Sequence, residues 1–273
     1  MCPPCYRAAV DLSLASPAVR PADAGPIDAW WLGRIDYRAA WSLQRRLAAA
    51  RAADRIGDQL LLLEHPAVLT LGRSSDPAHV LATPEELDRH GIEVVRVERG
   101  GEVTYHGPGQ LVAYPILALS RRGLLVRPLV RALEAAMIAT CAAFGVTAGR
   151  RDGHPGCWVD PDASAPRKIG ALGLRVERGV SYHGIALNVA VDLTDFELID
   201  PCGMPGVVST SVVSELGRHD PPTTAIVREA AGIFAPALLA GLGADGADAP
   251  AAIAVETGTA RAALERLVAA AEA

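Results

Sequence analysis

The segment at residues 99–115, RGGEVTYHGPGQLVAYP, constrains the fold more than any other part of the chain. Two short runs of strand character are punctuated by Gly100-Gly101 and by Gly107-Pro108-Gly109. Consecutive glycines allow positive φ and let backbone N–H groups approach a ligand closely. So many polar side chains in the strands of a hydrophobic chain indicate a lined pocket. The alternative is a hairpin around one buried, hydrogen-bonded histidine, His106.

Composition excludes several classes of protein. Half of the 273 residues are hydrophobic and few are aromatic, which is typical of a globular chain with a sizeable core. The net charge of −5 argues against a general nucleic-acid binder. No apolar run approaches the ~20 residues that cross a bilayer, and the first 26 residues lack the pattern of a signal peptide. We therefore expect a cytoplasmic protein with neither a nucleic-acid nor a membrane partner.

The five cysteines are odd in number and widely spread, and a reducing compartment disfavours disulfides. Cys2 and Cys5 form a CxxC motif, but it stands in a Pro-rich terminus without strand or helix character. Cys141, Cys157 and Cys202 are not paired at metal-ligand spacing. We therefore expect no metal site, and any cysteine with a chemical role acts singly.

The periodicity predicts one α+β domain at residues 27–217, with a mixed, largely antiparallel sheet and helices packed on it. A flexible extension at 1–26 precedes it, and a helical, Ala-rich extension at 218–273 follows, with Pro236 interrupting one helix. Expected helices include 36–55, with Asp36 as N-cap, a short helix opened by a capping box at Thr83, and 127–144. A meander occupies residues 156–193, with a tight turn at Arg178-Gly179.

Two residues have patterns that suggest chemistry. Cys202 lies between Pro201 and Gly203, which predicts an uncrowded loop, although most lone cysteines are inert small hydrophobes. Lys168 is the only lysine in an arginine-rich chain. A sole lysine is suited to the one task that arginine cannot perform, the release of a proton, and chance in an arginine-biased sequence is the alternative.

Together these residues suggest a Cys–Lys pair. An ammonium beside a thiol favours the thiolate, and a thiolate attacks a thioester to form another thioester of similar energy. Transfer onward to an amine gives an amide and is downhill, so the pair fits a two-step covalent acyl transfer with lysine as proton shuttle.

The strands 170–174 and 183–186 are rich in small residues. Their N–H groups could stabilise an oxyanion if a bulge frees them from the sheet. Gly170, Gly173, Gly184 and Ala186 would also leave a channel for an acyl chain; close packing against a helix is an equal alternative.

The chain resembles the lipoyl(octanoyl) transferases over residues 28–217. The resemblance rests on the 99–115 segment, on RKIGALGLRV at 167–176, on SYHGIALNV at 181–189 and on DPCGMPG at 200–206, in family order. It implies the fold of the catalytic domain of biotin and lipoate ligases, with helices on one face of a mixed sheet, and neither a metal nor another cofactor.

The resemblance also implies roles for single residues. Cys202 matches the family's nucleophile, and Lys168 matches the lysine that promotes its thiolate. Ala171 stands where the family usually has serine, so a backbone contact is expected there. His106 is expected to position substrate or the catalytic loops. The residues that match the family's acyl-substrate segments are Arg99, Gly100, Gly101, Glu102, Val103, Thr104, Tyr105, His106, Ala171, Leu172, Gly173, Gly184, Ile185 and Ala186.

The implied reaction is transfer of octanoyl from acyl carrier protein to a lysine of lipoyl domains, such as glycine cleavage H protein and the E2 subunits of 2-oxoacid dehydrogenases. Acyl carrier proteins are acidic, so a basic patch is expected at Arg121-Arg122 with Arg127 and Arg131, or at Arg45-Arg46. Two alternatives are an ATP-dependent lipoate or biotin ligase of the same fold and an acyl-carrier binding module without turnover.

Overall fold

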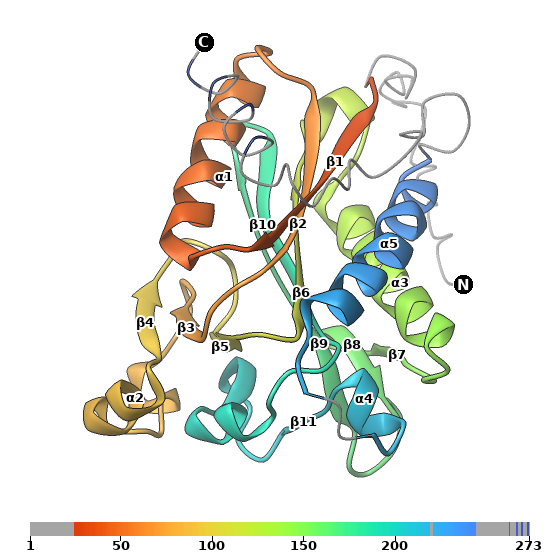
Figure 1. Ribbon diagram of the computed structural model, residues 1–273. Helices are drawn as coiled ribbons and strands as arrows, with labels where there is room; N and C mark the ends of the chain where they lie inside the picture. The colour runs from red at the N-terminus through yellow and green to blue at the C-terminus, as the bar shows by residue number, and fades with distance from the viewer. Residues whose placement is uncertain are drawn as a thin grey trace, which may run out of the picture.

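Most strands belong to one twisted sheet, shown in Figure 1. The computed structural model describes residues 25–218 and 221–243, with residues 262, 266, 269 and 272 described singly. β1 pairs in parallel with β2, short β11 (Val208–Ser209) pairs in parallel with β9, and the other neighbours are antiparallel. The expected mixed, largely antiparallel α+β sheet is therefore confirmed. Its order is β1 (Ile27–Arg34), β2 (Asp58–Glu64), β6 (Gln110–Ile116), β10 (Val180–Asn188), β9 (Arg167–Glu177), β8 (His154–Val159), β7 (Gly149–Arg151).

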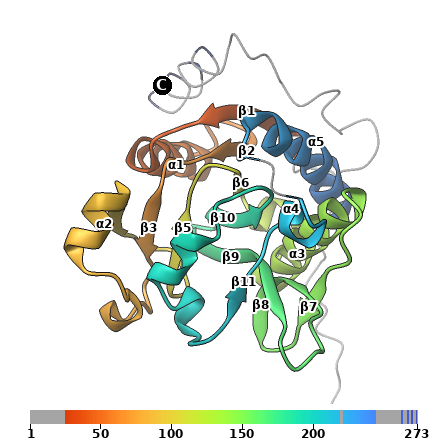
Figure 2. The same ribbon diagram turned by 60° about the horizontal axis from the view of Figure 1, so that its bottom comes forward.

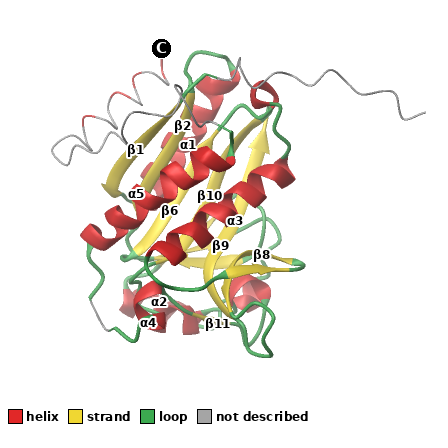
Figure 3. Cartoon of the chain, turned by 90° about the vertical axis from the view of Figure 1, so that its right-hand side faces the viewer, coloured by secondary structure: helices red, strands yellow, loops and turns green. Residues whose placement is uncertain are grey.

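Helices cover both faces of this sheet, which corrects the expectation of helices on one face. α1 (Tyr37–Ala52) packs on one side against Leu61 and Leu63. On the other side α3 (Val126–Ala143) and α5 (Thr224–Gly241) pack against Leu60 and Leu62, and Figure 3 shows both helices crossing that face. β2, an interior strand of the sheet, is apolar on both faces because both faces are buried.

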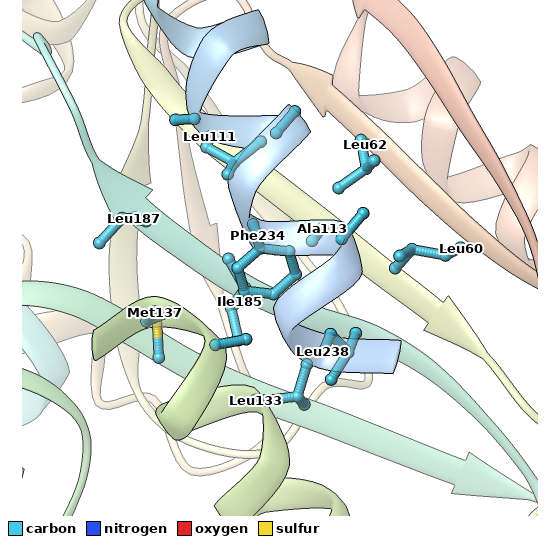
Figure 4. Close-up of a cluster of buried hydrophobic side chains, with 14 of the residues drawn as sticks. Leu60, Leu62, Leu111, Ala113, Leu133, Met137, Ile185, Leu187, Phe234 and Leu238 are labelled. Atoms are coloured by element: carbon cyan, nitrogen blue, oxygen red, sulfur yellow. The ribbon is translucent and has the colours of Figure 1, made fainter. Parts of the chain in front are cut away.

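The helix after residue 217 belongs to the core, which corrects its expected place in a C-terminal extension. Phe234 and Leu238 of α5 point into the cluster between the sheet and α3 (Figure 4). α5 is long and apolar enough to span a membrane, with mean hydropathy 1.3, but its packing on the sheet accounts for that apolar surface. Pro236 lies inside α5 without interrupting it, contrary to expectation. The remainder of the expected C-terminal extension is described only at single residues.

The 99–115 segment is not a hairpin, because its two strands belong to different sheets. β5 (Val103–His106) pairs with β3 (Val68–Leu71), which also pairs with β4 (Glu93–Arg96), whereas β6 lies in the large sheet. Gly109, at φ +85°, makes the connection between them, and a Cβ there would lie 2.5 Å from the carbonyl oxygen of Ala190. Glycine is required because another chain segment passes so close.

Two helix caps and one turn that the sequence predicts are present in the structure. Asp36 caps α1 by accepting a hydrogen bond from the Ala39 N–H, and α2 (Pro84–His90) begins with the predicted capping box at Thr83. Arg178 and Gly179 both have positive φ and join β9 to β10 tightly. The expected N-terminal extension and the Cys2–Cys5 motif lie almost wholly outside the described residues.

Candidate active site

Cys202 lies in a short turn of 3₁₀ helix at Pro201–Gly203, in the predicted loop between proline and glycine. Its backbone is left-handed, with φ 59° and ψ 26°. Gly203 is left-handed as well, at φ 63°. A left-handed conformation is costly for a residue with a Cβ, so the surrounding structure must hold Cys202 in place.

A β-bulge aims Lys168 toward this turn. β8 pairs Cys157 with Gly170 and then Trp158 with Lys168, so Ile169 is the extra residue on β9. Ile169 packs in the core on the α3 side, and a Cβ on Gly170 would meet Met137 of α3 at 2.7 Å. Ile169 and Gly170 thus both face α3. Lys168 before them and Ala171 after them face the opposite side of the sheet. The bulge thereby places Lys168 on the side of Cys202.

Lys168 and Cys202, the two residues for which the sequence suggests a chemical role, lie in contact. Lys168 Nζ lies 3.1 Å from Cys202 Sγ, within hydrogen-bond distance, although 34 residues separate them. The ammonium also lies 4.9 Å from the centre of the Trp158 ring, and Lys168 is buried. Figure 2 shows β9 running close to β11 and the preceding loop that carries the cysteine. The pair forms a thiol with an adjacent proton donor and acceptor.

A cavity of about 520 Å³ opens at this pair. It brings together most of the residues selected from the sequence, which come from residues 99–106, 168–173, 184–186 and 202. Its lining includes Cys202, Lys168, Arg99, Gly100, Gly101, Glu102, Thr104, His106, Ala171, Leu172, Gly173, Gly184, Ile185 and Ala186.

Two selected residues do not line the cavity. Val103 and Tyr105 point to the opposite face of β5, where they pack with Leu69 and Phe196 in a separate apolar cluster. The Tyr105 hydroxyl donates a hydrogen bond to Asp195 at 2.6 Å. Alternation along the strand gives the reason: Thr104 and His106 face the cavity, and their neighbours face this cluster.

The small residues of β9 and β10 serve close packing as well as the cavity. A Cβ on Gly184 would lie 2.0 Å from the carbonyl oxygen of Ala113, and one on Gly173 would lie 2.8 Å from that of Gly100. Gly170 does not line the 520 Å³ cavity; it faces Met137, so helix packing explains it. Of the four small residues expected to border an acyl channel, Gly173, Gly184 and Ala186 line the cavity.

Arg99 is a buried cation on the cavity wall. It is 7% exposed and donates hydrogen bonds to the carbonyl oxygen and hydroxyl of Thr70, at 2.6 and 2.9 Å. No ion pair to a carboxylate is recorded for it within the described ranges. Burial lowers the pKa of its guanidinium from the ordinary value. Its charge is therefore directed at the cavity and the Cys202 turn.

A cluster of neighbouring histidine and tyrosine rings at the cavity was not predicted from the sequence. Tyr37 and Tyr114 line the cavity beside His106. His65 Nδ1 donates to the Ile35 carbonyl, so the Tyr114 hydroxyl donates a hydrogen bond to His65 Nε2 at 2.7 Å. Burial lowers the pKa of His65 to about 4. Polar residues within otherwise apolar strands were the available signal for this cluster, but α1 and two sheets had to be assembled before they met.

His183 of β10 is a further missed residue. It has positive φ, is 1% exposed and lines the cavity. Its N–H donates to Gln44 of α1, and its Nε2 atom has no hydrogen-bond partner. Burial lowers the pKa of His183 to about 3, so the imidazole is neutral at physiological pH.

The expected bulge for an oxyanion site does not lie between β9 and β10, whose register is unbroken from Val180↔Glu177 to Leu187↔Gly170. The outer edge of β9 offers another source of donors. There Gly100 N donates to the Leu174 carbonyl at 2.9 Å, beyond the point where pairing with β8 ends at Gly170. Alternate residues direct their polar groups to the same edge, so the Leu172 N–H faces that edge too.

The lining holds a thiol and an amine in contact and, among the described residues, no cluster of metal-ligating side chains. In the part of the chain that the structure describes, no group of three or more His, Cys, Asp or Glu side chains is arranged to hold a metal ion. The lining combines one thiol, one amine, one guanidinium and one carboxylate with histidines, tyrosines and small or apolar residues.

Comparisons with known proteins show the family to which this chain is related. The lipoyl protein ligase A/B catalytic domain matches residues 36–231. An octanoyltransferase of Chloroflexus aggregans is 52% identical over 191 residues, covering 70% of this chain and 85% of that protein. One of Burkholderia lata is 44% identical, covering 73% of this chain and 77% of that protein.

Solved structures with the same fold are more distant in sequence. Lipoate-protein ligase A bound with ATP superimposes with a TM-score of 0.60 at 15% identity, covering 89% of this chain and 93% of that one. LipL1 of P. falciparum in complex with lipoate gives 0.59 at 12% identity, covering 89% and 70%. These likenesses confirm the fold expected from the sequence.

Proposed function

This chain belongs to the family of the lipoyl protein ligase A/B catalytic domain, and we propose that it is an octanoyltransferase that works through a thioester on Cys202. The observation that carries the proposal is the 3.1 Å contact between Lys168 Nζ and Cys202 Sγ in the lining of a partly apolar cavity. The reaction supplies octanoyl groups for lipoate formation.

The reaction proceeds in two steps, acylation of Cys202 and transfer of the acyl group to an acceptor lysine. The Cys202 thiolate attacks the thioester carbonyl of the octanoyl donor; the carbon–sulfur bond to the carrier breaks, and Lys168 gives its proton to the departing carrier thiolate. The amine of an acceptor lysine then attacks the new thioester. An amide forms, the Cys202 thiolate leaves, and the neutral Lys168 amine takes the proton that the attacking amine loses.

The remaining residues bind the chain and stabilise charge. Ala171, Gly173, Gly184 and Ala186 border the space for the octanoyl tail. The Leu172 N–H on the free edge of β9 is the proposed oxyanion donor, and Arg99 contributes a fixed positive charge. Thr104 and His106 shape the wall, and His106 Nδ1 donates a hydrogen bond to Gln110 Oε1 at 2.8 Å, which fixes its ring.

Mass spectrometry tests the proposal directly. The protein incubated with octanoyl-acyl carrier protein should gain one octanoyl group, and peptide mapping should place it on Cys202. Cys141 and Cys157 are fully buried and serve as internal controls within the same sample. Cys202→Ser should show no adduct at neutral pH. Absence of an adduct on the wild-type thiol, with transfer intact, overturns the covalent mechanism.

Two alternatives make different predictions. An ATP-dependent ligase of this fold transfers free octanoate only with ATP, whereas the proposed enzyme needs an octanoyl thioester and no nucleotide. A binding module without turnover holds the octanoyl carrier but never modifies a lipoyl domain. The intact Cys202–Lys168 pair favours the transferase over both.

The proposed partners are octanoyl-acyl carrier protein as donor and lipoyl domains as acceptors, in a cytoplasm that keeps the described cysteines reduced. Of the two expected basic patches, Arg121, Arg122 and Arg131 are paired with Asp54, Asp58 and Glu134, which removes most of the first patch's free charge. In the second patch Arg46 is paired with Glu272 at 2.6 Å. Arg45 instead lies over Trp41 and borders, with Arg178, a hollow of about 840 Å³ beside α1. Neither Arg45 nor Arg178 has a recorded carboxylate partner in the described ranges.

We therefore place donor docking at Arg45 and Arg178. Arg45→Glu with Arg178→Glu should raise KM for the acidic carrier at least tenfold, leave kcat unchanged and remove most of the salt dependence of KM. Arg121→Ser, from the paired patch, is the matched control and should leave KM unchanged. If Arg121→Ser raised KM and the double variant did not, the docking surface would instead lie around Arg121.

A further inference from the structure

His79 and Glu102 meet directly against the residue that follows the nucleophile. Glu102 Oε2 lies 3.2 Å from His79 Nδ1 and accepts a hydrogen bond from the Asp76 N–H at 3.2 Å. A Cβ built on Gly203 would lie 2.8 Å from Glu102 Cγ and 3.0 Å from His79 Cε1. Both side chains thus pack against Gly203 so closely that they leave no room for a Cβ there.

The backbone beside His79 is joined to the same turn. The Asp200 N–H donates to the His79 carbonyl at 2.8 Å, and the Leu81 N–H donates to the Leu198 carbonyl at 2.9 Å. Val80 and Ile199 form an antiparallel bridge between these hydrogen bonds. The segment that carries His79 therefore runs alongside the segment that leads into Pro201 and Cys202, and the two cannot shift independently.

The Cys202 turn needs such support. Two consecutive left-handed residues, one of them with a Cβ, form a conformation that persists only where neighbours impose it. The contact with Lys168 depends on that conformation, since the direction of the Cα–Cβ bond follows from φ and ψ. A change of conformation at Cys202 would carry the thiol away from the amine at 3.1 Å.

We propose that His79 and Glu102 are positioning residues that hold the Cys202–Gly203 turn so that the thiol faces Lys168. The proposal rests on Cys202 being the acylated residue. It gives Glu102 a different role from the rest of the 99–106 segment: although Glu102 borders the cavity, its carboxylate is occupied by Asp76 and His79.

The test measures the thiol without the octanoyl reaction. The rate of Cys202 alkylation by iodoacetamide is recorded against pH for wild type, Glu102→Ala and Glu102→Gln. Loss of the carboxylate should move the alkylation profile of Glu102→Ala to higher pH, toward that of Lys168→Met, because the thiol no longer faces the amine. Glu102→Gln keeps an acceptor for the Asp76 N–H and the His79 ring, so it should restore most of the wild-type profile.

Octanoylation gives the second readout. Glu102→Ala should lower kcat at least tenfold and change KM for the donor less than twofold. His90→Ala is the matched control, because His90 forms a similar pair with Asp195 at 3.2 Å that does not touch the Cys202 turn. Its profile and kcat should equal those of wild type.

Other outcomes overturn the proposal. A raised KM with an unchanged alkylation profile would make Glu102 a substrate-binding residue. An unchanged profile and kcat would leave both residues without a role in positioning. If Glu102→Ala does not fold, His79→Ala removes the other half of the contact and is judged by the same profile. Failure of the covalent mechanism would appear instead as a wild-type protein without an octanoyl adduct.

Discussion

The ammonium of Lys168 lies between the Cys202 thiol, at 3.1 Å, and the ring of Trp158, whose centre is 4.9 Å from Nζ. Trp158 is fully buried, and its indole N–H donates to the His154 carbonyl at 3.0 Å, so the ring is fixed beneath the amine. A cation on an aromatic face keeps its charge and a defined position. The lysine is therefore held where a proton can pass between it and the substrate.

Lys168→Arg should separate charge from proton transfer. Arginine keeps a positive charge over Trp158 but cannot release a proton at neutral pH. We expect kcat to fall about 100-fold or more, in the range of general acid–base catalysis. Alkylation of Cys202 by iodoacetamide at pH 7 should stay within about threefold of wild type, whereas Lys168→Met should slow both reactions. Full activity of the arginine variant would show that the lysine acts only by its charge.

Arg99→Met should lower activity without lowering stability. A buried cation without a carboxylate partner costs folding free energy, and methionine is a shorter, flexible side chain without the charge. We expect a midpoint of thermal unfolding equal to or above that of wild type, and octanoylation at least tenfold slower. Differential scanning calorimetry and adduct formation measure the two effects. A strongly lowered midpoint would mean that the hydrogen bonds to Thr70 outweigh the buried charge.

Gly184→Ala should destabilise the fold through β6. The new Cβ would lie 2.0 Å from the Ala113 carbonyl oxygen, so β6 and β10 must move apart. Overpacking of this kind costs about 1–3 kcal/mol in the free energy of unfolding. Gly57→Ala is the control, since a Cβ there meets nothing within 4 Å and its φ is not positive. Urea unfolding measures the free energy of unfolding of both variants. Equal values would show that the register between β6 and β10 is wrong.

Stability should fall with acid between pH 6.5 and 4. Burial lowers the pKa of His65 to about 4, against about 6.5 in the unfolded chain. Between these values the unfolded chain binds a proton that the folded chain does not, so the free energy of unfolding decreases as the pH falls. For one histidine the full loss is on the order of 3 kcal/mol.

His183, whose pKa burial lowers to about 3, should add to the same slope. Urea unfolding at pH 7.5, 6 and 5 measures the slope in wild type, in His65→Gln and in His154→Gln, a half-buried control outside the histidine–tyrosine cluster. His65→Gln should be less stable at pH 7.5 but show a shallower decline. Equal slopes in all three proteins would rule out His65 as the source.

Much of the local structure followed from the sequence because its causes are local. The capping box at Thr83, the cap at Asp36 and the Arg178-Gly179 turn depend on hydrogen bonds and dihedral angles within a few residues. The selection of Cys202 and Lys168 also came from the sequence, through a Pro-Cys-Gly loop and a single lysine.

Other features depended on contacts between distant segments. The 99–115 segment, with its glycines and polar strand residues, was predicted to line a pocket, but sequence pattern could not show that its two strands join different sheets. The core position of α5 and the second covered face of the sheet were likewise settled only when apolar surfaces met.

By itself the sequence determined the residue types that the chemistry needs and the order of most elements along the chain. Only the tertiary structure decided that a bulge at Ile169 turns Lys168 toward Cys202, that Val103 and Tyr105 face away from the cavity, and that His79 reaches Gly203. The physical reason is that side-chain direction depends on register, on bulges and on left-handed backbone positions. Those are fixed by packing between segments that lie far apart in the chain.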